Sequence, residues 1–186
     1  TDSMSTPTDS LLRRIDGSLQ APPGLDLRPL LLPMALCTDS RVRDGQLIGD
    51  PTEGALWVLA EKGGLAPTAE QQARPRLAEI PFDSAHKFMA TFHDAGEMVE
   101  VLVKGAPDVL LARSSRWLSA NGEQALDAAS RQLIESRNDD LAAQALRVLA
   151  VARRRIPAQE FDPAGDLMAW AGEWTFLGLA GLVPFP

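Results

Sequence analysis

The chain has 186 residues, of which 45% are hydrophobic, so it can bury one substantial core and we expect a single domain. Its formal net charge of −7 would repel a polyanion, and no basic stripe interleaved with aromatic residues offsets that charge, so nucleic acid is not an expected partner. The single cysteine excludes an internal disulfide and a cysteine-cluster metal site. No apolar run approaches the ~20 residues that cross a bilayer, so we expect no direct membrane contact.

The beginning of the chain differs in composition from the rest. Residues 1–20 are rich in Ser, Thr and Asp and show little hydrophobic periodicity, and Ala21-Pro-Pro-Gly24 follows as a punctuated linker. We therefore expect residues 1–27 to be a flexible or linker segment and residues 28–186 to form the folded domain.

Two helices are expected in the first half of the domain. A dense apolar run over residues 28–37 predicts a short buried helix, with Cys37 as a small buried hydrophobe. A second helix should span residues 51–62, because Asp50 can cap it and the proline that follows suits the first helical position. Glu53 then stands where its carboxylate can reach back to the cap amide, which completes a capping box.

Strands and helices alternate in the second half of the chain. Strict alternation of apolar side chains on either side of a turn predicts a β-hairpin, followed by two later strands. The expected strands span residues 87–93, 97–103, 146–156 and 174–183. Pro107 should open a helix that runs to Leu118, and a helical period returns over residues 126–144. Clustered strands interrupted by helices predict an α+β fold, an antiparallel β-sheet flanked by helices.

Phe82 and Lys87 are the first candidate binding residues. Phe82 precedes a turn-forming Asp83-Ser84 pair, so its ring should stand at the end of a strand. An exposed ring there can stack on a planar ligand, which contributes about 1–3 kcal/mol for a nucleic-acid base, although phenylalanine is more often a core residue. Lys87 offers a compact charge suited to phosphate oxygens. Because fifteen arginines stand beside only three lysines, a lysine at this position favours a geometric role over a merely solvated one.

Lys104 stands at the end of a predicted strand, immediately before Gly105. The glycine lets a ligand approach the backbone, and the helix that follows would offer free amides and a favourable dipole to an anion. Gly105 equally suits a simple strand-to-helix turn, and the residues alone leave both interpretations open. Glu53 is explained by the capping box without any ligand, and Arg147 fits an outward-facing strand residue.

Three sequence blocks carry a family resemblance: Gly49-Asp-Pro-Thr-Glu-Gly-Ala-Leu56, Ile80-Pro-Phe-Asp-Ser-Ala-His-Lys-Phe-Met89 and Val103-Lys-Gly-Ala-Pro-Asp108. A Leu-Cys-x-Asp-Ser stretch precedes them at residues 36–40. In this order and at this spacing, the blocks resemble the nucleotide-binding domain of type II cation-transporting P-type ATPases, the group that includes calcium, sodium/potassium and proton pumps. The resemblance covers residues 30–183 and implies the α+β fold of that domain.

The resemblance implies an ATP pocket. By similarity, the phenylalanine of the Pro-Phe motif stacks on adenine, the glutamate of the first block lies at the adenine side, and Arg147 reaches the phosphates. The implied ATP-binding residues are Glu53, Phe82, Lys87, Met89, Lys104, Gly105, Arg147 and Leu149. Two positions depart from the family pattern: Ser84 stands where many calcium-pump relatives carry an arginine, and Asp108 replaces a glutamate.

The resemblance also implies what surrounds the domain. Its ligand would be ATP or ADP, with Mg²⁺ expected only in the full-length pump. Its partners would be the phosphorylation and actuator domains of the parent pump. The chain would be a cytoplasmic domain of an integral membrane protein that transports a cation.

The sequence lacks the motifs that phosphoryl transfer needs. It contains no Asp-Lys-Thr-Gly-Thr nucleophile motif, no magnesium-binding aspartate pair and no Gly-x-x-x-x-Gly-Lys-Ser/Thr loop. His86 and His93 have no carboxylates at a ligating spacing, so we assign no catalytic residue and no metal ligand. We expect the chain to bind ATP and present its γ-phosphate to an aspartate on a separate phosphorylation domain, without hydrolysing ATP alone. The alternative is a non-catalytic interaction module of the same fold that has lost nucleotide affinity; a free-standing hydrolase is disfavoured.

Overall fold

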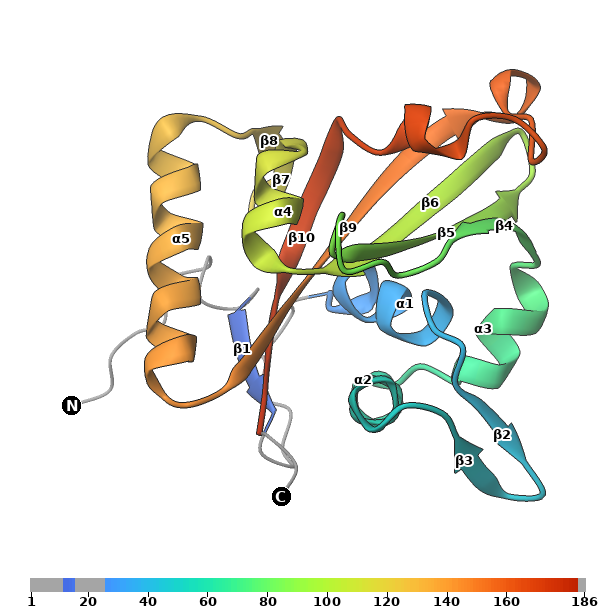
Figure 1. Cartoon of the computed structure of the whole chain (residues 1–186), viewed down its shortest axis with the longest axis horizontal. Coiled ribbons are helices and arrows are strands. Elements are labelled where there is room, and N and C mark those ends of the chain that lie inside the picture. Colours follow the sequence, from blue (N-terminus) through green and yellow to red (C-terminus); the bar gives the residue numbers. More distant parts are fainter. Residues whose placement is uncertain (1–11, 16–25, 184–186) are drawn as a thin grey trace.

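An eight-stranded β-sheet forms the centre of the computed structural model, which describes residues 12–15 and 26–183 (Figure 1). Its strands are β1 (Leu12–Ile15), β4 (Arg76–Ile80), β5 (Phe88–Ala95), β6 (Met98–Gly105), β7 (Ser114–Ser119), β8 (Gly122–Ala125), β9 (Arg147–Pro157) and β10 (Trp174–Leu182). The strand order is β4-β5-β6-β9-β10-β7-β8, and β1 pairs with β10 off this path. The pairings of β10 with β7 and β1 are parallel and the others are antiparallel, which confirms the expected α+β fold.

Helices cover both faces of this sheet. They are α1 (Arg28–Leu36), α2 (Pro51–Lys62), α3 (Pro67–Ala73), α4 (Pro107–Ala112) and α5 (Ala128–Ala143), with short 3₁₀ turns η2 (Ala158–Glu160) and η3 (Leu167–Trp170). Figure 1 shows α4 and α5 together on one side of β10, and α1, α2 and α3 grouped beneath β5 and β6. A separate two-stranded hairpin, β2 (Arg41–Arg43) and β3 (Gln46–Ile48), extends from the α1–α2 side.

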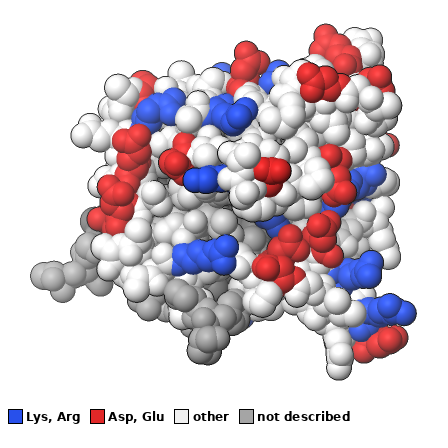
Figure 2. All heavy atoms as spheres, viewed as in Figure 1, with Lys and Arg blue, Asp and Glu red and all other residues white. Residues whose placement is uncertain are grey.

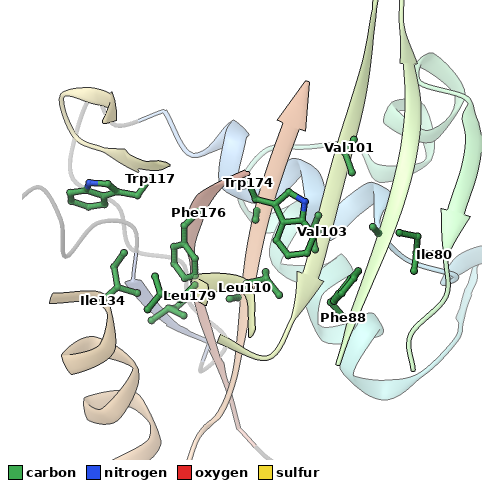
Figure 3. Close-up of a cluster of buried hydrophobic side chains, with 14 of the residues drawn as sticks. Ile80, Phe88, Val101, Val103, Leu110, Trp117, Ile134, Trp174, Phe176 and Leu179 are labelled. Carbon is green, nitrogen blue, oxygen red and sulfur yellow. The ribbon is translucent and has the colours of Figure 1, made fainter. Parts of the chain in front are cut away.

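The two faces of the sheet are buried by alternate side chains of the same strands. In β5, Phe88 and Phe92 pack into the core that α4 and α5 share with β6, β9 and β10. Figure 3 shows Phe88 and Trp174 in this core, and their ring centroids lie 5.1 Å apart in an edge-to-face arrangement. Met89 points to the opposite face and packs with Leu102 and residues of α1. The alternation expected for the hairpin is therefore present. The face that carries Met89 is the face on which the end of β6 meets α2, through Lys104 and Glu53.

The expected helix over residues 107–118 is wrong beyond its first turns. The helix α4 ends at Ala112, and Ser114–Ser119 forms β7 instead. The strand pairs with β10, where Trp117 lies opposite Phe176 and keeps only 7% of its surface exposed. Strand pairing and burial of Trp117 stabilise this segment more than its local helical pattern would, so it forms a strand.

The other expected elements are confirmed, with ends displaced by at most two residues. The hairpin β2–β3, the helix α3 and the strands β1, β4 and β8 lie outside the ranges expected for helices and strands. Of the expected flexible segment 1–27, most lies outside the described residues, as does the end of the domain at residues 184–186; Leu12–Ile15 is described, as β1. In the part of the chain that the structure describes, no helix is long and apolar enough to span a membrane.

Candidate functional site

A cavity of about 580 Å³ lies where the ends of β5, β6 and β9 meet the N-terminal half of α2. Its lining includes all eight residues singled out from the sequence: Glu53, Phe82, Lys87, Met89, Lys104, Gly105, Arg147 and Leu149. These residues come from four elements and the β4–β5 loop, so only the tertiary fold brings them together. The volume falls within the range of about 300–1,000 Å³ that is typical of small-molecule sites.

Phe82 projects from the β4–β5 loop and keeps 63% of its surface exposed. The loop is held in shape by two hydrogen bonds at Asp83, whose carboxylate accepts from Ala85 N at 2.6 Å and whose carbonyl accepts from Lys87 N at 2.7 Å. The prediction that this ring stands outside the core is confirmed. An exposed ring beside a cavity gains apolar burial when a planar ligand covers it.

Lys87 and Gly105 are joined by a close approach of two backbones. Lys87 has a left-handed backbone, with φ of 61°, and its carbonyl accepts a hydrogen bond from Ala106 N at 3.1 Å. A Cβ at Gly105 would lie against the Lys87 carbonyl and 2.8 Å from the Phe88 Cα. Glycine is therefore needed here for strand packing, a reason that differs from both the ligand approach and the strand-to-helix turn that the sequence suggested. The same contact fixes the backbone from which the Lys87 side chain enters the cavity.

Lys104 and Glu53 form an ion pair in the wall of the cavity. Lys104 Nζ lies 2.7 Å from Glu53 Oε1, and the two side chains are 11% and 15% exposed. Burial alone would raise the pKa of Glu53, but the hydrogen bond and charge of Lys104, with hydrogen bonds from Thr38 and Asp39, outweigh burial and lower the pKa. The carboxylate therefore stays ionised, and Lys104 is held in place before any ligand arrives.

The expected capping box at the start of α2 is half right. Asp50 Oδ1 accepts hydrogen bonds from Thr52 N at 2.7 Å and Glu53 N at 3.2 Å, so the N-cap is confirmed. The Glu53 carboxylate does not turn back to the cap amide; it bonds Lys104 and the α1–β2 loop instead. A charged partner at 2.7 Å stabilises the carboxylate more than a neutral amide would. Glu53 therefore belongs to the cavity rather than to the cap.

The remaining lining residues complete two sides of the cavity. Arg147 begins β9, is exposed, and lies with Nη1 3.3 Å from Thr52 Oγ1, while Leu149 and the buried Met89 supply apolar wall. Sequence reasoning did not single out Thr52, although it stands next to Glu53 in the same motif. The helix α4 is six residues long, so its N-terminus adds less to anion binding than the expected long helix would.

His93 and His86 lie outside the cavity lining. His93 is buried, donates from Nδ1 to the Arg74 carbonyl at 3.0 Å and accepts at Nε2 from Thr91 Oγ1 at 2.7 Å. Burial lowers the pKa of His93, which keeps the ring neutral. Among the described residues, no three His, Cys, Asp or Glu side chains gather closely enough to hold a metal ion.

Charge is unevenly spread on this acidic molecule. Figure 2 shows acidic side chains down the edge formed by α5 and a hollow near the middle of the same face, bordered by Lys and Arg side chains. In the cavity lining, Lys87, Lys104 and Arg147 stand against Asp50 and Glu53. Since Glu53 is already paired with Lys104, the lining offers net positive charge to an anionic ligand.

The fold and this cavity define an α+β domain whose cavity combines an exposed aromatic ring with a cluster of cations. Residues 26–183 match the family described as P-type ATPase, cytoplasmic domain N. The chain belongs to this family, which confirms the resemblance seen in its motifs.

Similar proteins support the same assignment. The chain is 37% identical over 165 residues to the cation-transporting ATPase pma1 of Synechocystis sp., an alignment that covers 86% of this chain. It is 39% identical over 166 residues to a calcium-transporting ATPase of Bacillus subtilis, again over 86% of this chain. In both cases the match spans 18% of the relative's own length. The chain therefore corresponds to one domain of these larger proteins.

Proposed function

We propose that this chain binds ATP in the cavity and, within a cation-transporting P-type ATPase, presents the γ-phosphate to an aspartate on a separate phosphorylation domain. The observation that carries the proposal is the convergence of Phe82, Lys87 and Lys104 on one open cavity. Residues that merely decorated a surface would have no reason to converge, and the combination of ring and cations suits a nucleotide, which has a planar base and an anionic tail.

Six of the lining residues have specific roles in this proposal. The ring of Phe82 stacks on adenine, Met89 and Leu149 supply apolar contact, and Glu53 lies at the adenine side. Lys87 and Arg147, which are exposed, meet the phosphates. With one stacking platform and screened phosphate contacts in an open site, we expect net binding of about −4 to −5 kcal/mol, or roughly millimolar to high-micromolar affinity.

The parent pump supplies the rest of the chemistry in this proposal. The chain contains no Asp-Lys-Thr-Gly-Thr motif, so the nucleophile, the Mg²⁺ ligands and the ion pathway belong to other parts of the pump. The phosphorylation and actuator domains are the proposed partners, and the proposed location is the cytoplasmic side of the membrane. The domain lowers the barrier to phosphoryl transfer by positioning ATP, and the isolated chain does not turn ATP over.

A nucleotide titration followed by amide chemical shifts tests the proposal. ATP, ADP and AMP should bind within about one order of magnitude of one another, since the adenosine end supplies most of the binding free energy. Phe82→Ala should weaken binding at least about fivefold. It should leave the free energy of unfolding within about 0.5 kcal/mol of the wild-type value, since the ring is exposed.

Leu77→Ala is the matched control. Leu77 is a large apolar residue of β4 with 41% of its surface exposed, and it does not line the cavity. Its substitution should leave nucleotide affinity unchanged. No saturable shift up to several millimolar, or a Phe82→Ala variant that binds normally, would refute the ATP site and favour the interaction module of the same fold.

A further inference from the structure

The α1–β2 loop, Thr38-Asp39-Ser40, lies behind the cavity rather than in its lining, but it makes most of the contacts of one lining carboxylate. Glu53 Oε2 accepts hydrogen bonds from Thr38 Oγ1 at 2.9 Å, from Asp39 N at 3.0 Å and from Ser40 Oγ at 3.3 Å. The other oxygen, Oε1, accepts from Lys104 Nζ at 2.7 Å. The loop thus occupies one oxygen of the carboxylate and leaves the other for the lysine.

The loop is itself clamped from its far side by Arg76 of β4. One guanidinium nitrogen, Nη2, donates to the carbonyls of Leu36 at 3.1 Å and Thr38 at 2.5 Å, and Nη1 donates to Asp39 Oδ1 at 3.1 Å. Thr38 and Ser40 are each only 2% exposed. A second cavity of about 280 Å³ lies on this side and is lined by the loop and Arg76. The loop backbone is therefore fixed, with its two hydroxyls directed at Glu53.

We propose that the Thr38-Asp39-Ser40 loop is a positioning element of the ligand site. It fixes the orientation of the Glu53 carboxylate and, through it, of the Lys104 ammonium that the ligand meets. The inference rests on the proposed role of the cavity as a nucleotide site. It also gives a role to the Leu-Cys-x-Asp-Ser stretch, which supplies no residue to the lining of the 580 Å³ cavity.

The physical reason is preorganisation. A lysine side chain loses about 1.5–2 kcal/mol of rotamer freedom when it is ordered. The ion pair with Glu53 orders Lys104 during folding, so ligand binding does not have to supply this entropy cost. Without donors on Oε2 the carboxylate could rotate about its terminal torsion, and the ammonium of Lys104 would follow it. Three donors on one oxygen prevent that rotation, and hydrogen bonds to an ionised acceptor are stronger than neutral ones.

Substitutions at Thr38 separate positioning from simple structural support. Thr38→Val removes the hydroxyl and keeps the branched shape, whereas Thr38→Ser keeps the hydroxyl and serves as the rescue. Ser40→Ala removes the longest of the three bonds and provides a milder second variant if Thr38→Val folds poorly. Thr91→Val is the matched control, because it deletes another buried threonine hydroxyl, which bonds His93 rather than Glu53.

The first measurement uses the full chain without nucleotide. The chain has three lysines, so the ¹⁵Nζ spectrum holds at most three lysine signals, and Lys104 is distinguished as the buried one, hydrogen-bonded to Glu53. In Thr38→Val the pKa of Glu53 should rise towards its ordinary value, because a donor to the ionised form is lost, and the Lys104 signal should shift or broaden. Thr38→Ser and Thr91→Val should keep the wild-type values.

The second measurement is ATP affinity by the same amide-shift titration. Thr38→Val should bind ATP about fivefold more weakly, because Glu53 loses one hydrogen bond and the Lys104 ammonium that it holds becomes less ordered. Thr38→Ser should stay within about twofold of wild type, and Thr91→Val should match it. Unchanged affinity in Thr38→Val would overturn the positioning role, whether or not the Glu53 pKa had risen.

Failure of the ATP site itself gives a different result. A wild-type chain that shows no saturable ATP binding would refute the nucleotide proposal, while the Glu53 and Lys104 signals would still report on the loop. In that case an unshifted Lys104 signal in Thr38→Val would overturn the positioning role as well. A shifted Lys104 signal would support the positioning role of the loop for another ligand of the cavity.

Discussion

Gly105→Ala and Gly54→Ala add the same methyl group near the site and should change stability in opposite directions. At Gly105 a Cβ would lie against the carbonyl oxygen of Lys87 and 2.8 Å from both Cα and Cβ of Phe88. Phe88 pairs with Gly105 in the β5–β6 ladder, and Ala106 N donates to the Lys87 carbonyl at 3.1 Å. The obstructing backbone atoms cannot rotate away, so the two chain segments must separate locally.

The magnitudes follow from these contacts. Overpacking costs about 1–3 kcal/mol and the lost freedom of the unfolded chain returns only about 0.4–1 kcal/mol. We expect Gly105→Ala to lose about 1–2 kcal/mol net, which lowers Tm by about 2–8 °C in a domain of this size. Gly54 lies within α2, where a Cβ would meet only the end of the Leu47 side chain, at 3.4 Å. Alanine there favours the helix by about 0.5–1 kcal/mol, so Tm should rise by about 1–4 °C.

Thermal and urea unfolding followed by tryptophan fluorescence measures both changes. Trp174 is fully buried and packs edge-to-face on Phe88, so its emission reports on the core beside the altered strand. Gly105→Ala should also weaken ATP binding, because the backbone that carries Lys87 must move. A wild-type Tm in Gly105→Ala, or equal losses in the two variants, would refute the close strand approach.

Two further predictions concern buried charge and acid stability. Lys104→Met should lower the free energy of unfolding in urea by about 2 kcal/mol, because Glu53 loses its charged partner. The double variant with Glu53→Gln should recover more than half of that loss, and strictly additive effects of the two substitutions would contradict the coupling. Burial lowers the pKa of His93 in the folded state below its ordinary value of 6.5. At a pH below 6.5 the unfolded chain therefore binds more protons than the folded chain, so the contribution of His93 to stability, which is complete above pH 6.5, is lost as pH falls. His93→Asn, which can keep the donor to the Arg74 carbonyl, should reduce that loss between about pH 8 and about pH 5; an unchanged pH profile would exclude His93 as its source.

Phe82 illustrates how far local sequence reasoning reached. The turn-forming pair that follows it indicated a ring at the end of a strand, and the structure leaves that ring exposed. Burial cannot be deduced from residue type alone, since phenylalanine is usually a core residue. The family motif reversed that expectation because it reports on a three-dimensional position that relatives share.

Glu53 and Trp117 show where local reasoning failed. The position of Glu53 in the first turn of α2 satisfied the capping pattern, but Lys104, 51 residues away in sequence, is the stronger partner. Trp117 continued an apparent helical period until β10 offered it a strand partner. In both cases the decisive contact is distant in sequence, so no local window contains the interaction that determines the outcome.

The sequence by itself determined the α+β class, the positions of α1, α2, α5, β5, β6, β9 and β10, and eight of the residues that line the cavity, because hydrophobic period, caps and motifs are local or shared with relatives. Only the tertiary structure decided how these residues are used. It placed Glu53 between Lys104 and the α1–β2 loop, and it required glycine at position 105 for strand approach. Such contacts arise only when the packing of separate elements brings their atoms within a few ångströms, so they cannot be predicted from any single segment of the chain.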